Sequence, residues 1–113
     1  MEISKELAFS VEEYRGRIAN VRNKMAEAGL DILLLHSLPS ICYVTGYQTA
    51  ATRSYNCCVV TAQGSHELII ERDEQYNVKQ TSWVDQFSTF VRWVDPVQLT
   101  IDVVKRLAGN SRL

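Results

Sequence analysis

Apolar residues recur at helical spacing between Ser10 and Gly29. Ser10 and Glu13 have the spacing of a capping box, and Gly29 can adopt the left-handed conformation that ends a helix, with Leu30 folding back over Met25. The residues on the predicted inner face of this helix are Tyr14, Ile18, Val21, Met25 and Ala28.

A second long helix is predicted after Asp95. Asp95 is a suitable N-cap, Pro96 occupies the first helical position, and Gln98 completes a capping box. Gly109 is expected to end the helix. The predicted inward stripe consists of Val97, Ile101, Val104 and Ala108. Two shorter helices are expected, one over residues 41–47 and one from a cap at residue 73 to about residue 83.

The remaining apolar runs have the character of strands. Residues 31–35 are apolar without alternation, which predicts a central strand buried on both faces. Residues 55–61 and 66–71 flank a turn at 63–65 and are predicted to form an antiparallel hairpin. Residues 87–94 alternate as a further strand. The order of elements predicts an α/β fold, a single layered domain with a mixed sheet flanked by helices.

Length and composition limit the classes of function. The 113 residues are enough for one domain, and 46% hydrophobic with 22% charged residues is typical of a packed globular protein. Residues 10–113 are expected to form that domain and residues 1–9 a loose arm. Because 12 basic residues stand against 13 acidic ones, neither a nucleic acid nor an anionic membrane surface is an expected partner.

The apolar runs are too short to span a bilayer, and the N-terminus lacks the features of a signal peptide. The three cysteines, Cys42, Cys57 and Cys58, are an odd number with an adjacent pair, which favours a reducing, cytoplasmic location. Cys57 and Cys58 should point to opposite faces of a strand and behave as small buried hydrophobes rather than as a redox pair. Cys42 with His36 as its base is a weak alternative for a nucleophile.

Converging metal ligands and phosphate-binding glycine loops are both missing from the sequence. It contains no H-E-x-x-H, no zinc-type cysteine spacing, no G-x-G-x-x-G and no G-x-x-x-x-G-K-[ST] motif. We therefore expect no catalytic residue, no metal site and no cofactor in this chain. Trp83, Trp93 and Tyr76 are expected to serve packing within the core or between domains, and His66 to be solvated on an exposed strand.

Two polar residues remain as candidates for binding. His36 follows the first predicted strand, at the carboxyl end where loops that face ligands gather in α/β sheets. The alternative is an imidazole hydrogen-bonded to a nearby backbone group. Arg53 is the only charged residue between His36 and Glu67, and a guanidinium binds carboxylates through two parallel hydrogen bonds. The alternative is an ordinary surface arginine.

Three segments stand out, in chain order Phe9-Ser10-x-x-Glu13-Tyr14-x-x-Arg17, Met25-Ala26-x-x-Gly29-Leu30-Asp31 and Ser40-Ile41-Cys42-Tyr43-Val44-Thr45-Gly46-Tyr47. Together they resemble the N-terminal domain of creatinase, Xaa-Pro aminopeptidases, prolidases and ectoine hydrolase. Ser40 stands where the family usually has Asn, and Ser is also a good helix N-cap. The most specific stretch runs from Tyr43 to Tyr47.

The resemblance implies a ribonuclease-H-like α/β domain that is itself non-catalytic, helps to form a homodimer and shapes access to an active site. Relatives continue beyond the position of Leu113 into a pita-bread domain, which binds two divalent metal ions in peptidases, and which can lack them in creatinase-type enzymes. The implied partner is therefore the chain's own C-terminal catalytic domain in a metal-dependent hydrolase. The alternative is a stand-alone α/β binding or regulatory module.

The resemblance also suggests a site. In creatinase-like relatives an arginine in the loop before the hairpin contacts the substrate carboxylate of the neighbouring subunit. Arg53 lies one place before the matching position, Ser54, a shift that a loop can absorb. Arg53, with His36 or Tyr55 nearby, is accordingly expected to bind an acidic end of the substrate in trans.

Overall fold

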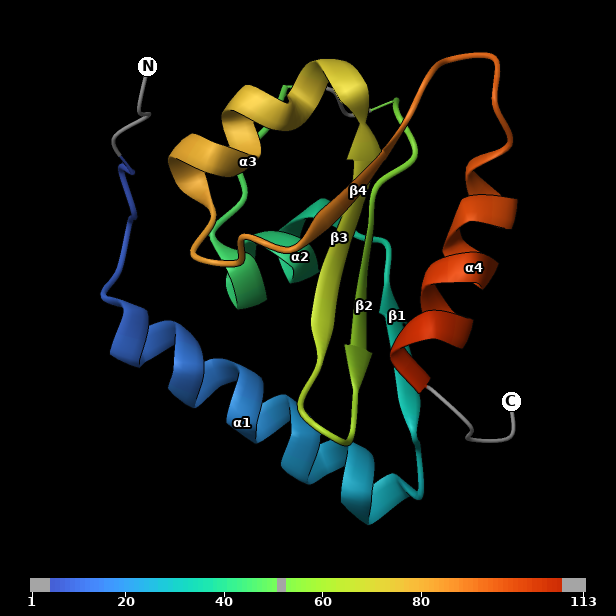
Figure 1. The fold of residues 1–113 in the computed structure, drawn as a ribbon. Helices are drawn as coiled ribbons and strands as arrows, with labels where there is room; N and C mark the ends of the chain where they lie inside the picture. The colour runs from blue at the N-terminus through green and yellow to red at the C-terminus, as the bar shows by residue number, and fades with distance from the viewer. Residues whose placement is uncertain (1–4, 51–52, 109–113) are drawn as a thin grey trace.

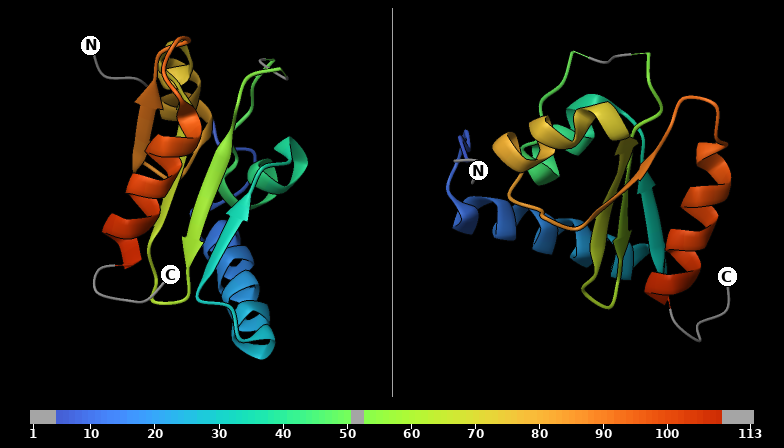
Figure 2. Two further views of the ribbon diagram at one scale, coloured as in Figure 1. Left: turned by 90° about the vertical axis from the view of Figure 1, so that its right-hand side faces the viewer. Right: turned by 45° about the horizontal axis from the view of Figure 1, so that its top comes forward.

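The computed structural model describes residues 5–50 and 53–108. Its elements form three layers, with a four-stranded sheet between two layers of helices (Figures 1 and 2). Helices α1 (Val11–Ala28), α2 (Leu38–Thr45) and α3 (Gln75–Thr81) lie on one face of the sheet, and α4 (Pro96–Ala108) lies on the other. The predicted α/β layered domain is confirmed. None of the helices in the described ranges is long and apolar enough to cross a membrane.

The sheet order is β1-β2-β3-β4, with β1 (Ile32–Leu35), β2 (Cys57–Thr61), β3 (His66–Glu71) and β4 (Phe87–Phe90). The β1–β2 and β2–β3 pairs are antiparallel and the β3–β4 pair is parallel, which confirms the mixed sheet and the hairpin. Strands β1, β3 and β4 therefore run in one direction. Their carboxyl ends and the start of β2 meet at the same edge of the sheet, where residues from four segments can form a site.

The prediction of a buried central strand at residues 31–35 is wrong. β1 is an edge strand, and Leu34 is 38% exposed. Leu33 and Leu35 pack against the core on the α1 side, and Ile32 packs against the α4 cluster. An apolar run without alternation fits this position as well, because α4 covers only part of the outer face of β1.

Cys57 and Cys58 are fully buried free thiols on opposite faces of β2, as predicted. Cys57 belongs to the cluster under α4, and Cys58 to the larger cluster under α1, α2 and α3. Burial raises the pKa of Cys57 to about 11 and that of Cys58 to about 12, which keeps both thiols protonated and unreactive at neutral pH.

Both predicted caps of α1 are confirmed. The Ser10 hydroxyl accepts a hydrogen bond from the backbone N–H of Glu13 at 3.1 Å. Gly29 has φ 70°, and the N–H of Leu30 donates to the carbonyl of Met25 at 2.8 Å, which is the predicted Schellman ending. Ala28, predicted on the inner face, is exposed. In α2 the N-cap is Ser37, not Ser40, so the helix begins earlier than predicted.

The predicted inward stripe of α4 is wrong for Val97 and Ile101 and right for Val104, which packs against the core. Its buried residues are Thr100 and Val103, while Val97 and Ile101 are 53% and 40% exposed. The helix is rotated because two polar contacts fix its inner face: Tyr55 with Thr100, and Arg106 with the buried Glu67. Leu99, Val104 and Leu107 complete the packing.

Of the two predicted N-terminal caps of α4, one is confirmed and one is wrong. The Asp95 cap is confirmed, since Oδ1 accepts from the N–H of Val97 at 2.9 Å. The Gln98 capping box is wrong, because its amide donates to Asp102. Gly109, the predicted end of the helix, lies outside the described residues.

Two further boundaries differ from the predictions. Asp73 does not cap α3 but lies in a 3-10 turn, Arg72–Glu74, that precedes it, and α3 ends at Thr81. β4 stops at Phe90 instead of continuing to residue 94, because the N–H of Val94 bonds back to the carbonyl of Val91 in a turn. The turn directs residues 91–94 away from the sheet and toward the edge described above.

The described part of the N-terminal arm is docked, not loose. Lys5 Nζ donates to the carbonyls of Lys79 and Ser82 at 3.1 and 2.8 Å and lies 2.7 Å from the Asp85 carboxylate. The N–H of Glu6 donates to the carbonyl of Gln80 at 2.6 Å. Composition alone does not reveal these long-range bonds, whose partners lie about 75 residues away. Residues 1–4 lie outside the described residues.

Candidate functional site

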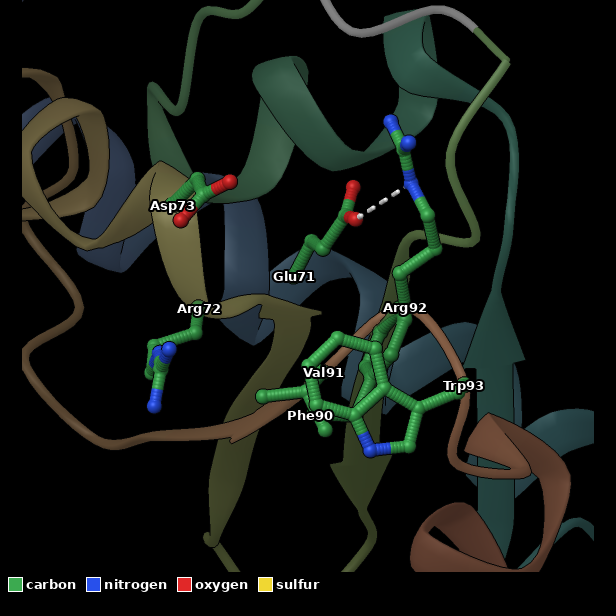
Figure 3. Close-up of a pocket in the computed structure, with 7 residues that line it drawn as sticks. All are labelled: Glu71, Arg72, Asp73, Phe90, Val91, Arg92 and Trp93. Atoms are coloured by element: carbon green, nitrogen blue, oxygen red, sulfur yellow. Dashed lines mark ion pairs between the residues drawn. The ribbon is translucent and has the colours of Figure 1, made fainter.

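Two adjoining hollows lie at the shared edge of the sheet, and together we call them the strand-end cleft. The first has a volume of about 260 Å³ and lies between the ends of β3 and β4, with the residues labelled in Figure 3 around it. The second, of about 340 Å³, is lined from the β2 side by Arg53, Ser54 and Tyr55. Glu71, Phe90 and Arg92 line both hollows.

Tyr55 and His36 lie side by side at this edge, with ring centroids 5.4 Å apart. His36 Nδ1 lies 3.3 Å from the carbonyl of Asn56, and because a carbonyl only accepts, Nδ1 carries the proton in this contact. His36 thus makes the hydrogen bond to a nearby backbone group that was the alternative to a ligand-binding role. Among the described hydrogen bonds none joins Cys42 to His36, so the structure gives no support to a nucleophile at Cys42.

The Tyr55 hydroxyl is engaged in the fold. It lies 2.7 Å from Thr100 Oγ1, whose own proton goes to the carbonyl of Pro96 at 2.8 Å. Tyr55 is therefore the donor in the first bond. Burial, more than the neighbouring Cys57 and Asp95, raises the pKa of Tyr55 despite the bond with Thr100. Tyr55 is a neutral phenol that holds α4 to the cleft.

Arg53 is exposed at the mouth of the second hollow. Beside it, the Ser54 hydroxyl donates to Glu71 Oε2 at 2.7 Å, and Arg92 Nε lies 3.9 Å from Glu71 Oε1, the ion pair drawn in Figure 3. The structure thus brings Arg53 and Tyr55 into one hollow, with His36 against Tyr55. That these residues bind a substrate carboxylate stays a prediction.

The cleft residues that follow β4 were not predicted from the sequence. Arg92 and Trp93 were placed inside a strand, whereas they follow its end and line the cleft beside Glu71 and Asp73. The sequence signal that could have identified Arg92 and Trp93 is their position at the carboxyl end of a parallel strand pair, where ligands bind in α/β sheets. The rim therefore carries both signs of charge, an arrangement suited to a small zwitterion.

A hydrogen-bonded carboxylate anchors the signature segment. Glu74 Oε1 accepts from the Tyr47 hydroxyl at 2.6 Å, from Asn77 Nδ2 at 3.1 Å and from the Thr49 hydroxyl. Partial burial acts to raise the pKa of Glu74, but the three hydrogen bonds outweigh it and the pKa is lowered. Burial and the Glu74 contact raise the pKa of Tyr47. The cluster ties the end of the Tyr43 to Tyr47 signature to the start of α3.

The prediction that His66 is solvated is wrong. His66 is half-buried, its ring centroid lies 5.3 Å from that of Trp83, and its Nδ1 lies 3.1 Å from Arg22 Nη2. Trp83 itself packs on the core, stacked on Tyr14, as predicted. Burial, followed by the positive charge of Arg22, lowers the pKa of His66.

This environment predicts an acid-sensitive fold. Because the folded chain resists protonation of His66, the unfolded chain binds the extra proton as the pH falls below 6.5, the ordinary pKa of histidine. The free energy of unfolding should decrease there, by at most about 1.4 kcal/mol per pH unit, and be insensitive to His66 above that range. Urea denaturation at pH 7.5 and 5.5 measures the difference. His66→Gln should reduce it and His36→Gln should not; equal effects of the two would contradict the assignment.

Within the described residues no group of three or more His, Cys, Asp or Glu side chains could hold a metal ion. The strand-end cleft presents charged and aromatic side chains, and the Ser54 hydroxyl within it donates to the carboxylate of Glu71. The arrangement can bind and orient a ligand. That the chain has no catalytic residue and no cofactor remains an expectation.

Comparison with known proteins identifies the class. The sequence profile of the Creatinase/Prolidase N-terminal domain matches residues 17–113, and the chain belongs to this family. Ectoine hydrolase of Halomonas elongata is 29% identical over 83 residues, which are 74% of this chain and 21% of the relative. The chain thus spans about a fifth of that protein's length.

Solved structures share the fold. The N-terminal domain of a Xaa-Pro dipeptidase from Lactobacillus brevis superposes with a TM-score of 0.73 at 18% identity, covering 82% of this chain and 69% of that one. Dipeptidase PepE from Mycobacterium ulcerans gives 0.71 at 23% identity, covering 80% of this chain and 25% of that one. The α/β fold inferred from the sequence is that of creatinase-type N-terminal domains.

Proposed function

We propose that this chain is the non-catalytic N-terminal domain of a metal-dependent hydrolase of the Xaa-Pro peptidase or creatinase type. In this role it packs against its own C-terminal catalytic domain, contributes to a homodimer and shapes access to the active site. The metal ions belong to the catalytic domain, and no step of the reaction is assigned to a metal in this chain.

The observation that carries the proposal is an exposed apolar surface beside the strand-end cleft. We call it the α4 apolar surface; its residues are Trp93, Val94, Val97 and Ile101, which are 83%, 46%, 53% and 40% exposed. Trp93 and Val94 also line the cleft, and Val97 and Ile101 lie one turn apart on α4. Large apolar side chains left exposed close to one another in the chain favour a protein interaction site. In this family the natural occupants are the catalytic domain and the second subunit.

The activity is tested on the natural gene product that contains this chain. Loaded with Mn²⁺, Co²⁺ or Zn²⁺, it is assayed against a panel of Xaa-Pro dipeptides and creatine, in parallel with residues 1–113 alone. Turnover by the natural product and none by the isolated chain supports the proposal. A natural product that ends with this domain and turns over none of these substrates would instead support the stand-alone binding or regulatory module.

Arg53 should contribute to substrate binding in that protein. Loss of a charge-assisted bond to a desolvated carboxylate costs about 2 kcal/mol, so Arg53→Ala should lower kcat/KM about 30-fold. Arg53→Lys should recover part of the loss, because it keeps the charge without the planar fork. Lys24→Ala, which removes an exposed cation of α1 outside the strand-end cleft, is the matched control. Parental kinetics in both Arg53 variants would mean that Arg53 is an ordinary surface residue.

Trp93 should contribute to assembly. Exposed tryptophans that become buried at interfaces carry about 2 kcal/mol or more, so Trp93→Ser should raise the dimer dissociation constant about 30-fold. Sedimentation equilibrium of the natural gene product measures this constant. Tyr76→Ser, an exposed aromatic on α3 outside the surface, should leave it unchanged. An unaltered constant in Trp93→Ser would remove the α4 apolar surface from the dimer interface.

A further inference from the structure

A hollow larger than either part of the strand-end cleft lies at the other end of the sheet. It has a volume of about 520 Å³, within the range of small-molecule pockets, and runs between α1 and the start of β3. We call it the α1 groove. His66, the first residue of β3, is at one side, and the outer face of α1 is at the other. Among the described residues, the groove shares no lining residue with the strand-end cleft.

The charge of the groove has one sign. Arg15 and Arg22, which lie two turns apart on α1, line it together with the amide of Asn23. Among the described residues, no aspartate or glutamate lines it. For a domain with a net charge of −1, a hollow with two arginines and no acidic residue is a local positive site.

Arg22 is held rigidly in the groove wall. Its Nε donates to the carbonyl of Thr61 at 2.9 Å, and its Nη2 donates to the carbonyl of Ser65 at 3.1 Å and to His66 Nδ1. Within the described chain these bonds leave the Nη1 group without a hydrogen bond. A preorganised guanidinium loses little side-chain entropy when it binds a ligand through its remaining donors.

The Arg22 contact also fixes the state of His66. A guanidinium only donates, so Nδ1 of His66 is the acceptor and the proton of the neutral ring lies on Nε2. Among the described residues, Nε2 has no hydrogen-bond partner. The groove therefore offers an oriented N–H from a ring that lines it, in addition to the guanidinium of Arg15.

The walls between these donors are apolar and rigid. Ile18 and Ala19 of α1 line them, opposite the indole of Trp83. Trp83 cannot turn freely, because its Nε1 donates to the carbonyl of Val44 at 2.8 Å and its ring stacks on Tyr14 at 6.5 Å with an interplanar angle of 11°. The groove thus pairs a flat aromatic wall with a positive rim.

From this geometry we propose that the α1 groove binds a small carboxylate that carries a flat apolar group. The carboxylate lies between Arg15 and the Nε2–H of His66, and the apolar group packs over Ala19 against Trp83. A free aromatic acid and the C-terminal residue of a peptide share this chemistry. The site is independent of the proposed function, because it lies away from the strand-end cleft and uses none of its residues.

The chain itself provides the measurement. It has two tryptophans, so Trp93→Phe leaves Trp83 as the only indole and makes its fluorescence a reporter of the groove. N-acetylphenylalanine should change that fluorescence with a dissociation constant of about 1 mM or tighter. Its amide, which lacks the charge, should bind at least about tenfold more weakly. Acetyl-Gly-Gly-Phe is the second arm; a preference for either acid identifies the source of the ligand, and binding of either supports the site.

Variants of α1 separate the site from non-specific binding. Arg15→Ala should weaken binding of N-acetylphenylalanine about tenfold, and Ala19→Phe, at an exposed helix position, should abolish it by filling the groove. Lys24→Ala, an exposed cation of α1 outside the groove, is the matched control. Circular dichroism establishes that each variant is folded. Equal binding of acid and amide, unchanged binding by Arg15→Ala, tighter binding of inorganic phosphate, or no saturation at about 10 mM would each overturn the proposal.

Discussion

Gly46→Ala is expected to lower the free energy of unfolding by about 3 kcal/mol or more. Gly46 has φ 85°, a left-handed conformation that costs other L-residues about 1–2 kcal/mol. A Cβ at this position would also lie 2.7 Å from the carbonyl oxygen of Thr81 and 2.8 Å from the hydroxyl of Tyr14. Overpacking of this kind adds about 1–3 kcal/mol. Chemical denaturation of the isolated domain measures the change.

Gly29 is the matched control because it shares only one of these two constraints. It ends α1 with φ 70°, but a Cβ there would meet no atom within 4 Å. Gly29→Ala should therefore cost about 1 kcal/mol, and the β-branched Gly29→Val about 1 kcal/mol or more. If Gly46→Ala were no more harmful than Gly29→Ala, the close approach of Tyr14 and Thr81 would carry no energetic weight.

This close approach gives the signature segment a physical reason. Gly46 lets the backbone after α2 pass against the Tyr14 ring and the end of α3, where the N–H of Gln48 donates to Thr81 Oγ1 at 3.0 Å. On the other side, the N–H of Trp83 donates to the carbonyl of Thr45 at 2.9 Å. The segment therefore joins three elements that are distant in sequence. In this chain its glycine serves packing rather than chemistry.

Sequence reasoning succeeded where local chemistry decides the structure. Ser10 and Gly29 bound α1 as predicted, because caps depend on a few neighbouring residues. The hairpin followed from the two extended runs that flank the turn at residues 63–65. The resemblance carried by the segment from Tyr43 to Tyr47 led to the right family, which no pattern of periodicity could have specified.

The predictions were wrong where a residue distant in sequence determines which face of an element is buried. Val97 and Ile101 have the spacing of an inward stripe. The opposite face is buried because Tyr55 bonds Thr100, 45 residues away, and Glu67 bonds Arg106, 39 residues away. The candidate site shows the same limit. Arg53 was visible as an isolated charge in a polar loop, whereas Arg92 entered the cleft only through a turn that ends β4 four residues before the predicted boundary.

Arg106→Ala is expected to lower the free energy of unfolding by about 2 kcal/mol. Glu67 is only 4% exposed, and both of its carboxylate oxygens accept from Arg106 Nη2, at 2.7 and 2.6 Å. Loss of one partner of a buried pair costs about 3–5 kcal/mol because the other charge stays buried. Here the cost is smaller, because the Arg106 side chain is 56% exposed and water can replace it, and because the Ser88 hydroxyl still donates to Glu67 at 2.6 Å.

The pair should be coupled, and a double-mutant cycle measures the coupling. Glu67→Gln removes the charge while keeping the shape, so Arg106→Ala should cost at least about 1 kcal/mol less in that background than in the parent. Lys105→Ala, the neighbouring cation at the same end of α4, should change the free energy of unfolding by less than about 0.5 kcal/mol. Additive effects of the Glu67 and Arg106 substitutions would contradict the claim that this ion pair holds α4 in its rotated orientation. Since that orientation exposes Val97 and Ile101, uncoupling the pair should also weaken any assembly through the α4 apolar surface.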